Sequence, residues 1–527
     1  HFSMKHPGHL CLALLALLLG ACGDEPAPPS PPAWRPAGPV NVVLILVDTL
    51  RADAIFDEAG AYDTPSIDRL VQDGVACRRA FSSAPMTLPS HVSLFSSRSP
   101  FETKVLNNDQ PVPPSLPLAA EWFQQHGYDT RAVLSLATMN PPVVKTGVSR
   151  GFASYDVDYW MISRAEDTAS RMWRSLEQRD RSAPLFFFAH FSDPHEPYHA
   201  HGKETVRVGL KRDGELVETI VASDWSQTTR ALELPPGRTV FDLASPGRPV
   251  RRFRVRAFEF REGDQILPVT WEEGAEMERV NKARIVVDRG ERPAAECQLR
   301  TWITDVPRDK VARYRAEVAY VDRYVGELIR RLEQEGLYQD SLIVFTSDHG
   351  EALGERKFFG HVQQLTDEMI HVPLVVKLPR NDPRRAELER AAAGVVTQVD
   401  LVPTILDVAG LPPLPGQRGA SLLGAHESVH IAETHRPEAE KNQIALRDAQ
   451  YKLIYFADEQ RFELYDLAAD PGELNDVYAT HSGRRPDWPE KLVALYELST
   501  VPATDGPDGQ GQMDPAMLRA LGYGGED

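Results

Sequence analysis

Three short runs of consecutive apolar residues are the clearest pattern along this chain. The runs are Val42–Val47, Leu185–Phe191 and Ser341–Thr346. Uninterrupted hydrophobicity over so few residues is typical of strands that are buried on both faces of a parallel sheet. We therefore expect an α/β fold whose central strands come from distant parts of the chain.

Acidic or histidine residues follow each of these runs. Asp48 follows the first run, His195 lies shortly after the second, and Asp348 and His349 follow the third. In open α/β sheets, ligands bind beyond the carboxyl ends of the strands. These four residues are therefore expected to line one crevice. His190 lies inside the second run, and we interpret it as a hydrogen-bonded core histidine rather than a ligand.

Thr87 stands where a loop turns into a predicted helix. Pro89 occupies a position that the first turn of a helix tolerates, and apolar residues follow at Val92, Leu94 and Phe95. Backbone amides at a helix start attract anions, and a hydroxyl held there beside a metal ion is able to attack phosphorus or sulfur. Helix capping is the commoner use of such a threonine. The acidic strand ends favour the catalytic interpretation.

Amphipathic spacing predicts one long helix over residues 308–335. Its apolar positions recur at helical spacing, and they are Tyr314, Val318, Val321, Val325, Leu328 and Leu332. Gly336 follows as a stop signal. Asp322, between these apolar positions, is expected to be a surface acid.

Alternating strand-like patterns set residues 204–304 apart as a β-rich insertion. The strand patterns cover 205–208, 217–221 and 253–256, with turn signals at 213–214 and 235–237. The insertion divides a catalytic domain of residues 40–203 and 305–395. A smaller C-terminal subdomain is expected over 396–499 and a mobile tail over 500–527. The insertion either shapes the active-site cleft or is a solvated embellishment.

The N-terminal segment has the features of an export signal. The apolar stretch from Leu10 to Leu19 is too short to span a membrane. The sequence then reads Gly20-Ala21-Cys22, which resembles a bacterial lipobox, so residues 1–22 are interpreted as a signal peptide and Cys22 as a lipidation site. An ordinary signal peptide is the alternative. Residues 23–39 are rich in proline and predict an extended tether, which would hold the protein in the bacterial cell envelope, facing the periplasm or the surface.

Composition and charge fit a large acidic enzyme. The chain has 527 residues, 42% of them hydrophobic, and a net charge of −18, so a sizeable core is expected. The negative charge argues against a nucleic-acid partner, and any anionic substrate must be recognised by local groups. The body of the protein contains Cys77 and Cys297, and the sequence leaves open whether they pair.

Further motifs extend this pattern along the chain, namely Asp48–Asp53, Thr64–Leu70, Gly127–Thr130, Val399–Leu406 and Glu463–Leu467. Together with Ser83–His91 and Asp348–Glu351, they make the chain resemble the sulfatase family of the alkaline phosphatase superfamily. The resemblance covers about residues 40–200 and 308–480. It implies an α/β, alkaline-phosphatase-like sandwich with a mixed, mostly parallel sheet flanked by helices. It also implies a metal-dependent hydrolase of sulfuric or phosphoric esters.

The nucleophile position departs from the family pattern. Family sulfatases carry cysteine or serine where Thr87 stands, and that residue is oxidised to formylglycine. Threonine is a secondary alcohol and cannot form this aldehyde, so the resemblance implies an unmodified Thr87 nucleophile, a covalent intermediate and no formylglycine. Superfamily relatives that use threonine act on phosphate groups, which favours phosphate esters or phosphonates. In addition, His91 replaces a usual arginine, and Thr49 replaces the second acid of a usual Asp-Asp pair.

The resemblance also implies roles for individual residues. One divalent cation (Ca²⁺, Mg²⁺, Mn²⁺ or Zn²⁺) is expected to be bound by Asp48, Asp348, His349 and Thr87. His195 and His361 are expected to stabilise the transferring group or to protonate the leaving group. The candidate substrate-binding residues are Arg51, His91 and Asn108, with a surface ion pair as the alternative for Arg51. A second cation bound by Asp193, His195 and His361 is the alternative to a single-cation site.

Three functions fit these residues. The favoured one is hydrolysis of a small-molecule or glycan ester by a protein anchored in the membrane through its N-terminal lipid. The alternatives are a phosphoryl-group transferase acting on an envelope lipid or glycan, and a non-catalytic ligand-binding protein with a sulfatase fold. Retention of Thr87, His195, His361 and the metal ligands favours an enzyme, whose oligomeric state stays open.

Overall fold

The computed structural model describes residues 36–57, 60–108, 110–136, 139, 146–157, 163–196, 198, 207–221, 228–244, 253–263, 265–273, 279–280, 282–305, 309–425, 429–435 and 442–500. The predicted signal peptide, Cys22, most of the tether and nearly all of the predicted tail lie outside these residues. Within the described residues, no helix is both long enough and apolar enough to cross a membrane.

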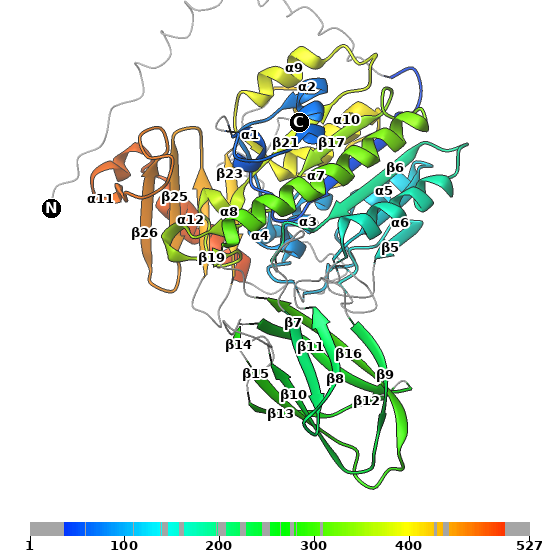
Figure 1. The fold of residues 1–527 in the computed structure, drawn as a ribbon. Coiled ribbons are helices and arrows are strands. Elements are labelled where there is room, and N and C mark those ends of the chain that lie inside the picture. Colours follow the sequence, from blue (N-terminus) through cyan, green and yellow to red (C-terminus); the bar gives the residue numbers. More distant parts are fainter. Residues whose placement is uncertain are drawn as a thin grey trace, which may run out of the picture.

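A seven-stranded sheet forms the centre of the structure (Figure 1). In spatial order its strands are β2 (Val75–Ala76), β21 (Leu374–Lys377), β17 (Leu342–Thr346), β1 (Val42–Val47), β6 (Leu185–Phe191), β4 (Asp129–Leu134) and β5 (Ser154–Val157). The strands from β17 to β5 are parallel, whereas the β17–β21 and β21–β2 pairs are antiparallel. The three apolar runs are thus adjacent central strands, and the mixed, mostly parallel sheet confirms the predicted fold class.

Alternate residues of β1 enter two different hydrophobic cores. Leu44 and Leu46 pack in the core on one face of the sheet, and Ile45 and Val47 pack in the core on the other. The first core includes residues of α3 (Thr87–Ser96), α5 (Ala119–Gln125), α9 (Arg385–Ala392) and α10 (Leu401–Ala409). The second includes residues of α1 (Asp53–Phe56), α2 (Pro65–Asp73), α6 (Ala165–Glu177) and α7 (Lys310–Gln334). Burial on both faces explains why the run has no polar position.

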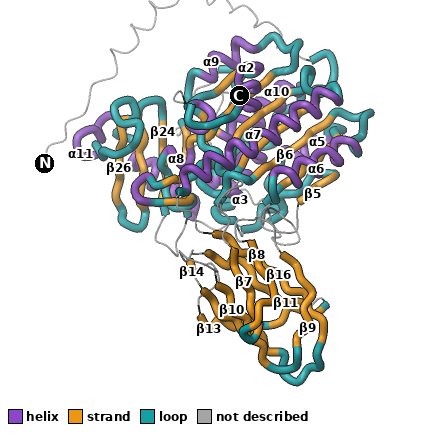
Figure 2. Tube along the Cα trace, viewed as in Figure 1, coloured by secondary structure: helices purple, strands orange, loops and turns teal. Residues whose placement is uncertain are grey.

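The insertion is a separate module of two antiparallel five-stranded sheets with its own apolar core. Figure 2 shows it as strands and loops, apart from the helix-covered sheet. The first sheet contains β13 (Val269–Glu273), β15 (Lys282–Asp288), β10 (Arg238–Ala244), β7 (Arg207–Arg212) and β8 (Glu215–Val221). The second contains β12 (Gln265–Leu267), β11 (Phe253–Glu262), β16 (Ala295–Asp305), β9 (Thr228–Leu234) and, beside β11, β14 (Arg279–Val280). The predicted strands are confirmed as β7, β8 and β11, except that residues 205 and 206 lie outside the described residues. The turn at Asp213-Gly214 is confirmed too, because both residues have the positive φ of a tight hairpin.

The C-terminal part of the chain is divided between two cores. Residues from Val396 to Leu423 pack in one core of the central sheet. A four-stranded antiparallel sheet follows, made of β23 (His430–Thr434), β24 (Gln443–Arg447), β25 (Tyr451–Phe456) and β26 (Arg461–Asp466), and it packs with α12 (Trp488–Thr500). The smaller layer therefore begins later than residue 396.

Short elements connect these layers. A three-stranded sheet contains β20 (His371–Val372), β3 (Ala80–Phe81) and β22 (Val396–Thr397), and a hairpin contains β18 (Ala352–Leu353) and β19 (Phe359–Gly360). The short helices are α4 (Pro100–Thr103), α8 (Asp367–Ile370) and α11 (Tyr478–His481).

The long predicted helix is confirmed as α7, but the prediction for Asp322 is wrong. The Asp322 side chain is buried and accepts hydrogen bonds from the backbone N–H groups of Ser66 at 3.1 Å and Ile67 at 2.8 Å. These amides open α2 and have no partner within that helix. Asp322 therefore caps α2 from another helix. The open question about the cysteines is also answered, because Cys77 and Cys297 are both buried and unpaired.

We expect Asp322→Ala to lower the free energy of unfolding by about 2 kcal/mol, since it leaves two amides at the start of α2 without an acceptor. Urea denaturation followed by circular dichroism measures this change. Asp340→Ala is the matched control, because Asp340 is exposed and forms a surface ion pair with Arg380. Equal stability of the two variants would contradict the capping role.

Candidate active site

The parallel register brings the acidic strand ends together. β1 lies between β17 and β6, with Leu46 opposite Thr346 and Val47 opposite Phe191. Asp48 directly follows β1, and its backbone N–H donates to the Phe191 carbonyl at 2.8 Å. Asp348 and His349 follow β17 at the same edge. All three side chains are fully buried.

Asp48, Asp348 and His349 form a group whose ligand atoms all lie within 4.8 Å of one another. His349 Nε2 lies 3.7 Å from Asp48 Oδ1 and 3.6 Å from Asp348 Oδ2. The other imidazole nitrogen, Nδ1, donates to the Gly350 carbonyl at 3.0 Å. Both Asp48 oxygens, Asp348 Oδ2 and His349 Nε2 have no hydrogen-bond partner among the described residues. Carboxylate oxygens with one neutral imidazole fit a divalent cation.

Electrostatics supports the same interpretation. Burial raises the pKa of Asp48 well above its usual range, and the neighbouring Asp348 and Glu351 carboxylates raise it further. Burial also raises the pKa of Glu351 to about 7. Several buried carboxylates are costly without positive charge nearby. A bound divalent cation would supply that charge.

Thr87 is the first residue of α3 and is 2% exposed. Met86 is the N-cap residue of this helix and makes no capping hydrogen bond with its own side chain, so the structure does not give Thr87 the capping role. The Thr87 carbonyl accepts a hydrogen bond from His91 Nδ1 at 2.7 Å, and the same nitrogen lies 3.7 Å from Asp348 Oδ2. One imidazole nitrogen therefore lies between the Thr87 backbone and the candidate metal site.

The three predicted substrate-binding residues have contacts within the protein. Arg51 forms ion pairs with Asp53 at 2.6 Å and with Glu355 at 2.8 Å. These contacts are of the kind that we considered as the alternative to substrate binding by Arg51. Asn108 Oδ1 accepts from the Leu88 backbone N–H at 2.9 Å and so caps the start of α3. His91 is fully buried. Asn108 thus supports the start of α3, and Arg51 connects Asp53 with Glu355.

His195 and His361 lie close together, with ring centroids 4.9 Å apart. The His361 ring is also 4.6 Å from the His349 ring. Glu351 Oε2 lies 3.3 Å from His361 Nδ1, which donates to the carboxylate. His195 Nδ1 donates to the Glu196 carbonyl at 2.6 Å. Burial, together with His361, lowers the pKa of His195 to about 4, so this imidazole is neutral near pH 7.

Asp193 does not join these histidines in a three-ligand group among the described residues. Its Oδ1 accepts from the Ala165 backbone N–H at 2.9 Å, at the start of α6. The alternative cation site at Asp193, His195 and His361 is therefore not assembled in this structure.

Gln398 and Glu351 are the residues of this region to which the sequence assigned no role. The Gln398 side chain is buried, and its Oε1 lies 2.9 Å from Ser90 Oγ. Its amide nitrogen donates to the carbonyls of Ser347 at 3.1 Å and Asp348 at 3.0 Å. Ser90 Oγ itself donates to the Asp348 carbonyl at 2.7 Å. Gln398 therefore connects the Thr87 helix to the Asp348 loop. The only signal in the sequence was its position just before the Val399–Leu406 motif.

Family models match most of the chain. The model described as Sulfatase matches residues 40–411, and the model described as N-sulphoglucosamine sulphohydrolase, C-terminal, matches residues 354–485. The first match covers more than half of the chain, and the fold and the strand-end site agree with it. The protein belongs to the sulfatase family, and it is accordingly an ester hydrolase.

Curated relatives extend over most of the chain. It is 22% identical to N-acetylglucosamine-6-O-sulfatase of Bacteroides thetaiotaomicron over 94% of this chain and 90% of that protein. It is 33% identical to arylsulfatase K of Mus musculus over 37% of each chain.

Solved structures share the fold. Phosphonate monoester hydrolase of Agrobacterium radiobacter has a TM-score of 0.56 at 20% identity, covering 87% of this chain and 96% of the other. BT4656, in complex with its substrate D-glucosamine-2-N,6-O-disulfate, has a TM-score of 0.56 at 16% identity, covering 90% and 100%.

We expect Gln398→Ala to lower both divalent-cation affinity and kcat by about ten-fold to a hundred-fold, because Asp348 and the Thr87 helix lose their shared partner. Isothermal titration with the cation and steady-state kinetics measure the two effects. Gln124→Ala, on the exposed side of α5, is the control. Unchanged affinity and kcat in a folded Gln398→Ala protein would show that Gln398 has no positioning role.

Proposed function

We propose that this protein is a divalent-cation-dependent hydrolase of phosphate esters or phosphonates that uses the unmodified Thr87 hydroxyl as its nucleophile. The observation that carries the proposal is the position of Thr87. It begins α3, and this helix is bonded to the Asp348 loop through Ser90 and Gln398. Oxidation of a threonine gives a ketone, so this residue cannot supply the formylglycine aldehyde.

Asp48, Asp348 and His349 would hold the cation, and Thr87 Oγ is the further ligand that the family resemblance suggests. When bound, the cation lowers the pKa of a neighbouring hydroxyl and offsets charge on the ester oxygens. The buried, unpartnered oxygens of Asp48 and Asp348 and the Nε2 atom of His349 suit the role of cation ligands.

The reaction needs two displacements at phosphorus. Thr87 Oγ forms a bond to phosphorus as the bond between phosphorus and the leaving alkoxide breaks. The proton of the Thr87 hydroxyl is transferred to that alkoxide, which departs as the alcohol. Water then attacks the threonine ester, which releases phosphate or phosphonate and regenerates the hydroxyl. His361 Nδ1 donates to Glu351 and the His195 ring lies beside the His361 ring, so these two imidazoles would exchange protons with the reacting groups.

Two similarities bear on the substrate class. The fold is shared with a phosphonate monoester hydrolase, whereas the long curated match is to a sulfatase that acts on an N-acetylglucosamine 6-O-sulfate. We favour phosphorus substrates because the nucleophile is threonine. Sulfate esters are the competing class, which direct comparison of substrates distinguishes.

We expect Thr87→Ala to lower kcat by about a thousand-fold or more, since the attacking oxygen is removed. Thr87→Ser should keep measurable activity because it retains the hydroxyl. Aryl phosphate, aryl phosphonate and aryl sulfate are assayed in parallel with Mg²⁺, Ca²⁺, Mn²⁺ or Zn²⁺. Thr480→Ala, an exposed position in α11, is the control.

Each outcome of this panel has a defined meaning. Turnover of a phosphorus ester that disappears in Thr87→Ala supports the proposal. Turnover of aryl sulfate alone overturns the argument from the nucleophile. A protein that binds the cation but turns over no substrate in a Thr87-dependent way would instead be a ligand-binding member of the family.

A further inference from the structure

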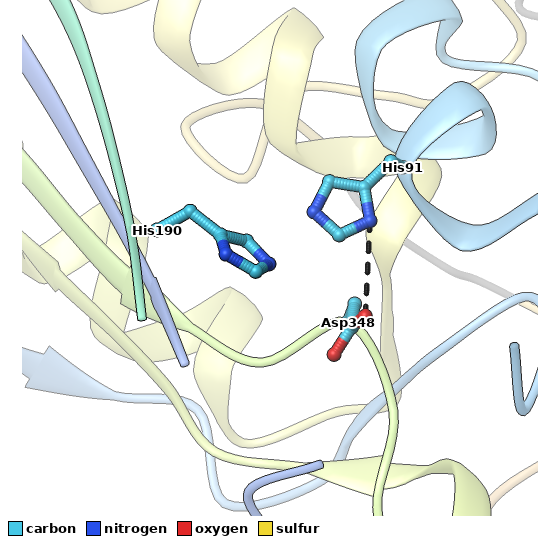
Figure 3. A group of neighbouring side chains, drawn as sticks. All are labelled: His91, His190 and Asp348. Carbon is cyan, nitrogen blue, oxygen red and sulfur yellow. Dashed lines mark ion pairs between the residues drawn. The ribbon is translucent and has the colours of Figure 1, made fainter. Parts of the chain in front are cut away.

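A second group of potential ligands lies beside the candidate metal site and shares Asp348 with it. His91 comes from α3, His190 comes from β6, and Asp348 follows β17. Figure 3 shows these three side chains pointing toward one another, with the ion pair between His91 and Asp348 dashed. One ligand atom from each lies within 4.8 Å of the others, and all three side chains are fully buried.

Each residue of this group has an atom with no hydrogen-bond partner among the described residues. These atoms are His91 Nε2, His190 Nε2 and Asp348 Oδ2. Buried polar atoms are normally hydrogen-bonded, so an exception on each of three neighbouring residues requires an explanation. A core histidine, as the sequence suggested for His190, would be expected to satisfy both ring nitrogens.

One nitrogen of each histidine already has a neighbour, and for His91 that neighbour is a carbonyl, which fixes the proton on Nδ1. His91 Nδ1 donates to the Thr87 carbonyl at 2.7 Å, which leaves Nε2 as a lone pair. His190 Nδ1 lies 3.3 Å from Ser135 Oγ. Metal-binding histidines commonly use their other nitrogen in this way. His349 in the first site is built likewise, with Nδ1 on a carbonyl and Nε2 unpartnered.

We propose that His91, His190 and Asp348 bind a second divalent cation, so that the Asp348 carboxylate serves two cation sites. Two imidazoles and one carboxylate favour Zn²⁺ over Mg²⁺ or Ca²⁺, which prefer oxygen ligands. The site differs from the one considered at Asp193, His195 and His361. This proposal rests on the proposed function in one respect, which is that Asp348 is a ligand in both sites.

The position of this second site gives it a defined relation to the nucleophile. His91 holds the carbonyl of Thr87, and Ser90, its neighbour in α3, holds the Asp348 carbonyl. A cation bound there would fix the first turn of α3 against β6 and β17. We therefore expect it to position Thr87.

Metal stoichiometry tests the proposal without any substrate. The full-length protein is stripped with a chelator, reloaded with Zn²⁺, passed through gel filtration and analysed for bound metal. We expect two equivalents in the unmodified protein, and one in each of His190→Gln and Asp48→Asn. His435→Gln is the matched control, because His435 is a buried histidine paired with Glu433 in the C-terminal sheet. It should keep both equivalents.

Three results would overturn the proposal. The first is a single equivalent that Asp48→Asn removes and His190→Gln leaves in place. The second is a protein that binds two equivalents of Zn²⁺ and loses one of them in His195→Gln but not in His190→Gln. The third is identical visible absorption of the Co²⁺-loaded unmodified protein and the Co²⁺-loaded His91→Gln protein. This comparison also tests the site if His190→Gln does not fold. Thr87→Ala leaves His91, His190 and Asp348 in place and should keep the equivalent bound by them, so loss of activity there and loss of this metal here are separate results.

Discussion

Burial of carboxylates at the ends of β1 and β17 is the constraint on which the site depends. Asp48, Asp348 and Glu351 are fully buried, and several of their oxygens have no partner among the described residues. An apolar double-sided sheet leaves no solvent at this edge to stabilise them. A bound divalent cation would balance this charge, and the surrounding elements hold the acids where such a cation would bind.

Backbone conformation and side-chain bonds maintain that arrangement. Thr49, just after Asp48, has a φ of 58°, in the left-handed region that a β-branched residue rarely adopts. Its backbone N–H lies 3.3 Å from Asp348 Oδ1, and its hydroxyl donates to the Asp48 carbonyl at 2.7 Å. Such strain persists where the surroundings determine it, commonly at functional sites. Thr49 replaces an acid of the usual family pair, and here it joins the two strand ends as a donor.

The sequence predicted the parts that depend on local pattern and missed those that depend on distant contacts. The apolar runs of β1, β6 and β17 predicted their burial, and their polar ends predicted the meeting of Asp48 with Asp348. Asp322 contacts Ile67, which is 255 positions away, and Gln398 contacts Ser90 and Ser347, which are 308 and 51 positions away, so no local pattern distinguished Asp322 and Gln398 from surface or scaffold residues. His190 looked like a core residue because it lies within a strand, and only the fold shows His91 and Asp348 beside it.

The proposed mechanism requires a covalent bond between Thr87 and the transferred group. Rapid-quench peptide mapping by mass spectrometry, with the cation-loaded protein and an aryl phosphate, detects that bond. We expect a phosphoryl group on the peptide that contains Thr87, present during turnover and absent in Thr87→Ala. A burst of product with no modified peptide, or a modification on another residue, would contradict it.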